Sequence, residues 1–238
     1  MTGELGDFLQ LLEASATSLG NRRKASDGPN IWRRNYTAGE TIVDWDEKKQ
    51  AFLFVASGWV ASGKVLTNGT RIVLDFPLAG DVITIGSTEW AREIITALSP
   101  VTIFELPGAP IENLLSYPRP ISQPILKAIA RRNARTTEHM ASLGRRGAVE
   151  RTAHMLLELS YRVQGQAKMT KAKFPCPLTQ SDLGDALGLT AVHVNRVLKE
   201  LREKGLASFR NGVVEIPDVD RLASLVGFDP SYLSLASE

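Results

Sequence analysis

The 238-residue sequence has a single cysteine, Cys176, and no long apolar run. One thiol cannot form an internal disulfide or supply a four-cysteine zinc or iron–sulfur site. No segment approaches the ~20 apolar residues that a membrane-spanning helix needs. The opening residues MTGELGDFLQLLEAS carry acidic side chains where a signal peptide carries basic ones. We therefore expect a cytoplasmic protein that does not contact a membrane.

Enzyme motifs are also absent. The sequence contains no HExxH, GxSxG or GxxxxGK[ST] pattern, so it lacks common signatures of metallopeptidases, hydrolases and P-loop enzymes. Histidine is scarce, and we expect His139, His154 and His193 each to have a packing or surface role. The expectation is a protein that is not an enzyme.

The net charge of +2 is spread unevenly along the chain. Lysine and arginine against aspartate and glutamate give 15 − 15 = 0 for residues 1–144 and 12 − 7 = +5 for residues 145–217. Residues 218–238 give 1 − 4 = −3. The positive segment would attract an anionic partner, although a solvated basic face would explain the same excess.

The pattern along the chain predicts an α+β fold in four parts, with 43% hydrophobic residues to build a core. Residues 1–30 are expected to form a helix, Glu4–Leu19, and a polar linker. Residues 31–118 hold short β-rich runs such as AFLFVASGWVAS and PVTIFELP, with a hairpin signal at Asn68-Gly69. Closely spaced short strands predict a β-sandwich or barrel.

The third part, residues 119–145, follows a cluster of prolines and is predicted to form one helix from about Pro124 to Leu143. This helix either covers the β-domain or forms a coiled-coil seam with a second copy of the chain. Gly144 to Gly147 predict a hinge, after which AVERTAHMLLELSYRV predicts a separate helix. The stripe on the long helix comprises Ile125, Ile129, Arg132, Thr136, Met140 and Leu143, and one side of the next helix carries Ala153, Leu156, Leu157 and Ser160.

The fourth part, residues 146–238, contains LTQSDLGDALGLTAVHVNRVLKELREKGL, which starts at Leu178. Thr179 is a predicted helix cap, and Gly188 is expected to end that helix in a left-handed conformation. Thr190 caps the next helix after one intervening residue, and Gly205 ends it. Two helices joined by so short a turn predict a helix-turn-helix.

The second of these helices has two different faces. Its apolar face is predicted to pack inward and comprises Val194, Val197, Leu198 and Leu201. The outer face offers a small apolar group, an amide, a guanidinium and an ammonium, which suit thymine methyls, base edges and phosphates. These outer residues are Val192, Asn195, Arg196 and Lys199.

A hairpin follows this pair of helices. In LASFRNGVVEIP, the turn Asn211-Gly212 separates two short strands, and Arg210 at the hairpin tip is placed to meet a phosphate. A closing helix is predicted near Val219–Val226. Together these elements predict a winged helix.

These motifs resemble the Crp/Fnr superfamily of bacterial transcription regulators. The helix-turn-helix stretch is the most specific match, and YTAGETI, VASGWVAS and AGDVI are similar to turns of its amino-terminal β-roll. The resemblance implies a β-roll of the double-stranded β-helix (jelly-roll) type, a long dimerisation helix and a winged helix-turn-helix. It also implies a homodimer that binds a palindromic operator of double-stranded DNA, with RNA polymerase as a further partner.

The resemblance also assigns candidate DNA contacts. Arg196 matches the base-reading arginine of the family, and Thr190 matches a phosphate-contacting hydroxyl residue. Ala191 and Val192 stand where relatives often have charged base readers, which leaves the operator sequence open. The candidate DNA-binding residues are Thr179, Thr190, Ala191, Val192, His193, Asn195, Arg196, Lys199 and Arg210.

The ligand sites of the family are matched poorly. Relatives that bind cyclic nucleotides place an arginine and a small residue after a Gly-Glu pair, whereas the corresponding loop here has Glu89 and Arg92 only three residues apart. The single cysteine cannot build the iron–sulfur cluster of the oxygen-sensing branch, and no histidine lies in the predicted β-roll. We expect no cyclic AMP, no iron–sulfur cluster, no β-roll haem and no other metal.

Cys176 is a candidate redox switch, because Lys171 and Lys173 nearby would favour its thiolate and oxidation beside the DNA backbone would weaken binding. The alternative is a loop cysteine without a regulatory role. For the whole protein, the alternative to a DNA-binding regulator is a winged-helix module that binds another protein. Binding through phosphates is distinguished from that alternative by its steep dependence on salt.

Overall fold

The β-rich runs of the N-terminal half form two sheets in the computed structural model, which describes residues 10, 16–17, 31–44, 50–86, 93–107, 111–165 and 169–234. By its internal contacts the chain divides into two units: Met1–Gly69 with Leu74–Arg132, and Thr70–Val73 with Asn133–Glu238. Most of the expected helix Glu4–Leu19 and of its linker lies outside the described residues. At Ala16–Thr17 the helix prediction is wrong, because these residues pair in parallel with Ile31 and Trp32.

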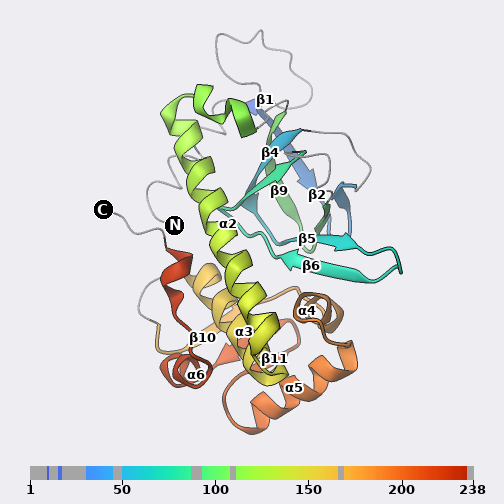
Figure 1. Ribbon diagram of the computed structural model, residues 1–238, viewed down its shortest axis with the longest axis vertical. Helices are drawn as coiled ribbons and strands as arrows, with labels where there is room; N and C mark the ends of the chain where they lie inside the picture. Colours follow the sequence, from blue (N-terminus) through green and yellow to red (C-terminus); the bar gives the residue numbers. More distant parts are fainter. Residues whose placement is uncertain are drawn as a thin grey trace. The chain divides into compact units, whose positions relative to one another are not determined.

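Apart from residues Arg71–Val73, both sheets of the N-terminal half belong to the first unit (Figure 1). One sheet has the strand order β1-β2-β9-β4-β7 and the other has the order β3-β8-β5-β6. The predicted hairpin at Asn68-Gly69 joins the neighbouring strands β5 and β6, and Gly69 has the positive φ of 82° that this turn requires. The strands are β1 (Ala16–Thr17), β2 (Ile31–Tyr36), β3 (Thr41–Val43), β4 (Ala51–Ser57), β5 (Val60–Val65), β6 (Arg71–Asp75), β7 (Val82–Ile85), β8 (Ile94–Ala97) and β9 (Val101–Pro107).

Strand β4 is buried on both faces, and this arranges the core of the unit. Phe52 and Phe54 point to one face and pack in a cluster with Phe104, whereas Leu53 and Val55 belong to a second cluster on the other face. A continuous apolar run is expected for a strand that is covered on both sides. The predicted β-roll is confirmed.

A long helix, α2 (Arg119–Arg145), follows the short 3₁₀ helix η1 (Ile111–Ser116). The prediction that the helix starts near Pro124 is wrong, because α2 begins five residues earlier. Pro120 lies in the first turn, where backbone N–H groups lack helical partners in any case. Pro124 removes only one hydrogen bond near the start of the helix, so the helix continues through it.

The predicted stripe on α2 does not form a single face exposed to a partner. Ile125 is fully buried in the cluster that contains Phe52 and Phe104, and Ile129 packs against that cluster. Met140 is 69% exposed. The interpretation that the helix covers the β-domain is therefore correct for the first half of the stripe and wrong for its end.

The second unit is built around α3 (Ala148–Gln164), which starts at the N-cap Gly147. The predicted break between the two helices is confirmed, but the burial of α3 is wider than predicted. Every residue from Thr152 to Ser160 is buried, because α3 contacts surrounding elements on several sides. These are α4 (Gln180–Leu187), α5 (Ala191–Glu203), α6 (Val219–Val226), η2 (Pro230–Leu233) and the sheet β10-β12-β11, whose strands are Ala172–Pro175, Val213–Ile216 and Ser208–Arg210.

Two of the histidines, His139 and His154, have structural contacts within this unit. His154 is 2% exposed, and its ring meets the ring of Phe228 edge-on, with the two ring centroids 4.9 Å apart. Burial, and then the charge of Arg146, lower the pKa of His154 to about 4, so it is neutral at pH 7. His139 Nε2 lies 3.1 Å from Glu158 Oε2, and Tyr232 donates to the same oxygen at 2.8 Å.

Gly184 of α4 lies close to the backbone of the turn that follows the helix. A Cβ at this position would lie 2.5 Å from the carbonyl oxygen of Leu189. We expect Gly184→Ala to lower the free energy of unfolding by ~1–3 kcal/mol through overpacking, measured by urea denaturation followed by circular dichroism.

Gly147→Ser is the matched control for Gly184→Ala. A Cβ there meets only Glu150 Oε2 at 3.7 Å, and serine is at least as good an N-cap as glycine. This variant should lose no stability. An unchanged stability of Gly184→Ala would contradict the close approach of the Leu189 backbone to α4.

Candidate nucleic-acid interface

The start of α4 is fixed by a reciprocal cap. The backbone N–H of Asp182 donates to Thr179 Oγ1 at 3.1 Å, and the N–H of Thr179 donates to Asp182 Oδ2 at 2.9 Å. Burial would raise the pKa of Asp182, but hydrogen bonds from Thr179 and from Arg71 outweigh burial and lower this pKa. The cap therefore stays charged at neutral pH.

The turn from α4 to α5 is short, and backbone hydrogen bonds hold it to both helices. Gly188 has the predicted left-handed conformation, with φ 62° and ψ 40°. The N–H of Leu189 donates to the carbonyl of Gly184 at 2.9 Å, and the N–H of His193 donates to Thr190 Oγ1 at 3.2 Å. Both predicted caps are confirmed, and the two helices have a fixed relation.

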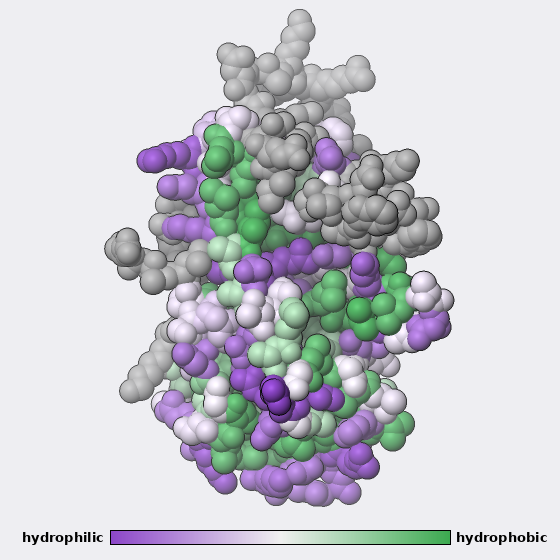
Figure 2. Space-filling model, in the orientation of Figure 1, coloured by the Kyte–Doolittle hydropathy of each residue, from purple (hydrophilic) through white to green (hydrophobic). Residues whose placement is uncertain are grey.

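Helix α5 has the two faces that the sequence predicts. Its inner residues Val194, Val197, Leu198 and Leu201 are at most 5% exposed. The outer residues Val192, Asn195, Arg196 and Lys199 are all exposed, and Val192 reaches 82%. In Figure 2 hydrophilic side chains cover the edge of the second unit where Figure 1 shows α5. This outer face is free to meet a partner.

The predicted hairpin is confirmed, and its strands β11 and β12 form the wing of the winged helix. Asn211 and Gly212 have φ angles of 51° and 70°, as a two-residue hairpin turn requires. Arg210 ends β11 at this turn and is exposed. Strand β10, which the sequence analysis did not predict, adds a third strand, and the N–H of Cys176 donates to the carbonyl of Gly212 at 2.8 Å.

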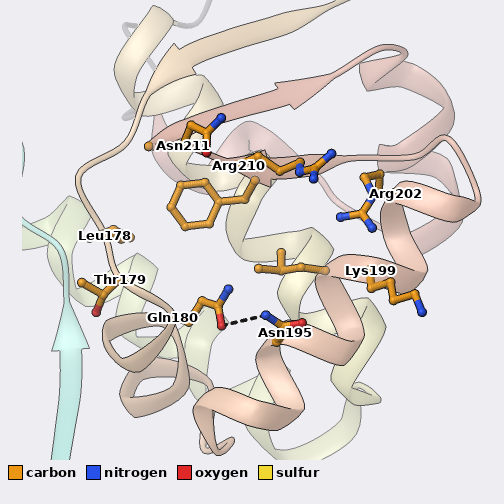
Figure 3. Close-up of a pocket in the computed structure, with 11 residues that line it drawn as sticks. Leu178, Thr179, Gln180, Asn195, Lys199, Arg202, Arg210 and Asn211 are labelled. Atoms are coloured by element: carbon orange, nitrogen blue, oxygen red, sulfur yellow. Dashed lines mark hydrogen bonds between the residues drawn. The ribbon is translucent and has the colours of Figure 1, made fainter.

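A groove of about 450 Å³ lies between the start of α4, the exposed side of α5 and the wing. Arg202 of α5 and Arg210 of the wing both line this groove, and Figure 3 shows them at the same end of it. Asn195 Nδ2 donates to Gln180 Oε1 at 3.2 Å on the opposite side of the groove. The groove is lined by Leu178, Thr179, Gln180, Asn195, Leu198, Lys199, Arg202, Phe209, Arg210, Asn211 and Gly212, which include three cations and no carboxylate.

The structure separates the candidate DNA contacts into two groups. Some line the groove, namely Thr179, Asn195, Lys199 and Arg210. The others, which do not line it, lie in the first two turns of α5 or at its cap: Thr190, Ala191, Val192, His193 and Arg196.

The hydroxyl groups of Thr179 and Thr190 differ in whether their proton already has an acceptor. Thr179 Oγ1 donates to Asp182 Oδ2 at 2.7 Å while it accepts from the backbone, so its proton is used within the cap. Thr190 Oγ1 accepts the N–H of His193, and among the described residues its own proton has no acceptor. Thr190 is therefore the better phosphate donor of the two.

Sequence reasoning missed three polar side chains of the groove: Gln180, Arg202 and Asn211. Arg202 follows Lys199 by three positions, so extending the outer stripe by one turn would have found it. Asn211 was considered only as a turn residue. Gln180 carries no signal in the sequence, because only folding brings it next to Asn195.

Cys176 does not have the surroundings that the sequence predicted. Cys176 is only 1% exposed, and burial raises the pKa of its thiol to about 12. Lys173 pairs instead with Glu215 across the strands. The prediction that neighbouring lysines favour the thiolate is wrong, and the burial supports the alternative of a cysteine without a regulatory role.

No helix in the part of the chain that the structure describes is both long and apolar enough to cross a membrane. The same residues contain no group of three or more His, Cys, Asp or Glu side chains that could hold a metal ion. Glu89 and Arg92 lie outside the described residues. The expectations against cyclic AMP, an iron–sulfur cluster and haem therefore stay predictions.

Comparison with known proteins agrees with both units. Residues 33–117 match the cyclic nucleotide-binding domain, and residues 150–225 match the Crp-like helix-turn-helix domain. The nitrogen fixation regulation protein FixK of Bradyrhizobium diazoefficiens is 26% identical over 193 residues, 81% of each protein. The fumarate and nitrate reduction regulatory protein of Escherichia coli is 24% identical over 192 residues, 79% of this chain and 76% of that protein.

Solved structures show the same architecture. FixK2 from Bradyrhizobium japonicum superposes with a TM-score of 0.69 and 26% identity, over 87% of this chain and 99% of that one. A mutant of CooA from Carboxydothermus hydrogenoformans has the same fold, with a TM-score of 0.67 at 17% identity, over 82% of this chain and 88% of that one.

A domain of the cyclic nucleotide-binding type joined through a long helix to a winged helix-turn-helix defines a class of two-domain transcription regulators. The chain belongs to the Crp/Fnr superfamily of this class, and it is a DNA-binding regulator of the Crp/Fnr type. Its relatives are regulators and not enzymes.

The burial of Cys176 generates a prediction about its reactivity. At pH 8 a thiol with a pKa near 12 holds about 10³-fold less thiolate than one with the ordinary pKa of 9. We expect iodoacetamide to label the native protein far more slowly than protein unfolded in guanidinium, measured by mass spectrometry. A Ser181→Cys, Cys176→Ala variant, with its thiol at an exposed position, should label rapidly in the native state. Equal rates for native and unfolded wild type would contradict the burial.

Proposed function

We propose that two copies of the chain bind a palindromic operator, each inserting α5 into a major groove. The observation that carries this proposal is the exposed outer face of α5 beside a cationic groove. A helix of this width fits the major groove of B-DNA, where every base pair presents a distinct pattern of donors and acceptors.

A seam on α2 supports the pairing of two copies. Five exposed residues follow one another at alternating spacings of four and three, as in a coiled coil. Thr137, although polar, has its hydroxyl bonded to the carbonyl of Asn133 at 3.0 Å, so it needs no other partner. The seam residues are Leu126, Ala130, Asn133, Thr137 and Met140.

Residues in the first two turns of α5 would contact the bases. Arg196 is exposed, and among the described residues its guanidinium has no ion-pair partner, so it is available for the two acceptors of guanine. Val192 presents an apolar side chain suited to a thymine methyl group. His193 and Ala191 lie on the same turn and are partly exposed.

The groove supports a second task, the binding of the DNA backbone. The lining of the groove contains three cationic side chains, Lys199, Arg202 and Arg210, and no carboxylate. Thr190 adds a hydroxyl donor at the start of α5. Lys199 Nζ is 3.7 Å from Glu203 Oε1, an exposed pair that a phosphate can readily replace. Such contacts position a protein on DNA without reading its sequence.

Two further roles remain part of the proposal. RNA polymerase is the partner that the family implies for a regulator bound at a promoter. A DNA-binding role would place the protein in the cytoplasm of a bacterium, with the chromosome. A protein-binding module is the less supported alternative, because the relatives are transcription regulators.

Selection of bound duplexes from a random pool tests the proposed operator. We expect enrichment of an inverted repeat with half-site centres ~10 bp apart, because two symmetric helices meet successive major grooves. Met140→Glu places like charges in the seam, so this variant should sediment as a monomer and lose the inverted repeat. An enriched sequence without symmetry would contradict the paired arrangement.

Arg196→Ala tests base reading on the selected operator. We expect a loss of ~1–3 kcal/mol, confined to sequences that keep guanine at one position of each half-site, measured by fluorescence anisotropy. Arg202→Ala is the control: it should weaken binding to all sequences about equally and reduce the dependence on salt by about one phosphate contact. A uniform loss with Arg196→Ala would remove its role in base reading.

A further inference from the structure

The hydrogen bond between Gln180 and Asn195 links two helices at the edge of the proposed DNA-binding face. Asn195 Nδ2 donates to Gln180 Oε1 at 3.2 Å, from the second turn of α5 to the first residue of α4 (Figure 3). Asn195 is exposed and Gln180 is partly exposed. Neither packing nor capping requires this bond, so its effect is on the direction of the Asn195 amide.

Hydrogen bonds hold the backbone behind both side chains. The backbone of Gln180 follows directly after the capping residue Thr179, which is held at both its N–H and its hydroxyl by Asp182. The backbone of α5 is held to α4 by the N–H of Leu189, which donates to the carbonyl of Gly184. The separation of Gln180 and Asn195 is therefore set before any DNA arrives.

The bond leaves a defined pattern on Asn195. One amide N–H is used by Gln180, and the second N–H and the oxygen Oδ1 remain, a donor beside an acceptor. Adenine presents the complementary pair in the major groove, an acceptor at N7 and a donor at N6. Guanine presents two acceptors, so one of them would face the Asn195 oxygen. A rotation of the amide by 180° would reverse the pattern and lose the match to adenine.

We infer that Asn195 is a specificity-determining residue that reads an adenine in each half-site, and that Gln180 is a positioning residue that holds the Asn195 amide in the reading orientation. This inference rests on the proposed function. Asn195 and Arg196 are consecutive on α5, with a rise of ~1.5 Å between them. The adenine should therefore lie within about two base pairs of the guanine that Arg196 reads.

The test measures affinity for the selected operator and for every single-base change in one half-site. Asn195→Ala should weaken binding to the operator about 5- to 150-fold and remove the preference for adenine at one position, as expected for the loss of one bidentate contact. Preferences at other positions, including the guanine, should remain.

Gln180 is tested by two variants that differ in one property. Gln180→Leu removes the acceptor, and it should reduce the adenine preference about 2- to 10-fold, the size of one hydrogen bond. Gln180→Glu keeps an acceptor for the Asn195 N–H, so it should retain the adenine preference while its charge lowers affinity for every sequence. In an Asn195→Ala background, Gln180→Leu should have no further effect on that position.

The controls separate the inference from the proposed function. Ser181→Ala, at the exposed neighbour of Gln180, should bind like wild type, and circular dichroism should show that all variants are folded. If Arg196→Ala loses its guanine preference while Asn195→Ala weakens all sequences equally, the inference is overturned and the proposed function stands. If Gln180→Leu leaves the adenine preference unchanged, the positioning role is overturned. If wild type enriches no sequence, the proposed function itself fails.

Discussion

The contact between Gly184 and Leu189 is the constraint on which the DNA-binding unit depends. Because residue 184 has no side chain, the backbone of the turn approaches α4 closely, and the Leu189 N–H reaches the Gly184 carbonyl. The left-handed Gly188 and the cap at Thr190 then fix where α5 starts and which way it points. A larger residue at position 184 would move the whole recognition face.

Helix α5 divides its residues between stability and binding. Each of its four buried aliphatic side chains contributes roughly 1.5–3 kcal/mol to folding, and together they fix the helix on α3 and α4. The outer face contributes little to folding, since Val192 and Arg196 contact mainly solvent. A polar outer face can thus change its base preferences without changing the fold.

The long helix α2 also serves two surfaces. Its first turns complete the core of the β-domain through Ile121, Ile125 and Ala128, and Arg132 donates to Glu93 Oε2 at 2.6 Å, where the hydroxyl of Ser62 also binds. The opposite side of the helix remains exposed and carries the seam residues. The proposed pairing of two copies would therefore use a different side of α2 from the one that packs in the β-domain core. The single stripe that the sequence predicted does not distinguish these two sides.

Much of the DNA-binding unit could be predicted from the sequence, because its signals are local. Caps at Thr179 and Thr190, left-handed glycines and the Asn211-Gly212 turn act within a few residues, and the period of α5 identifies its buried face. The parallel pairing of Ala16–Thr17, the burial of Cys176 and the early start of α2 depend on partners distant in the sequence, and sequence reasoning missed them. The amino-acid sequence by itself determined which side of α5 meets solvent. Only the tertiary structure decided that Gln180 bonds to Asn195 and that Arg202 and Arg210 line the same groove, because side chains on different elements become neighbours only when those elements pack.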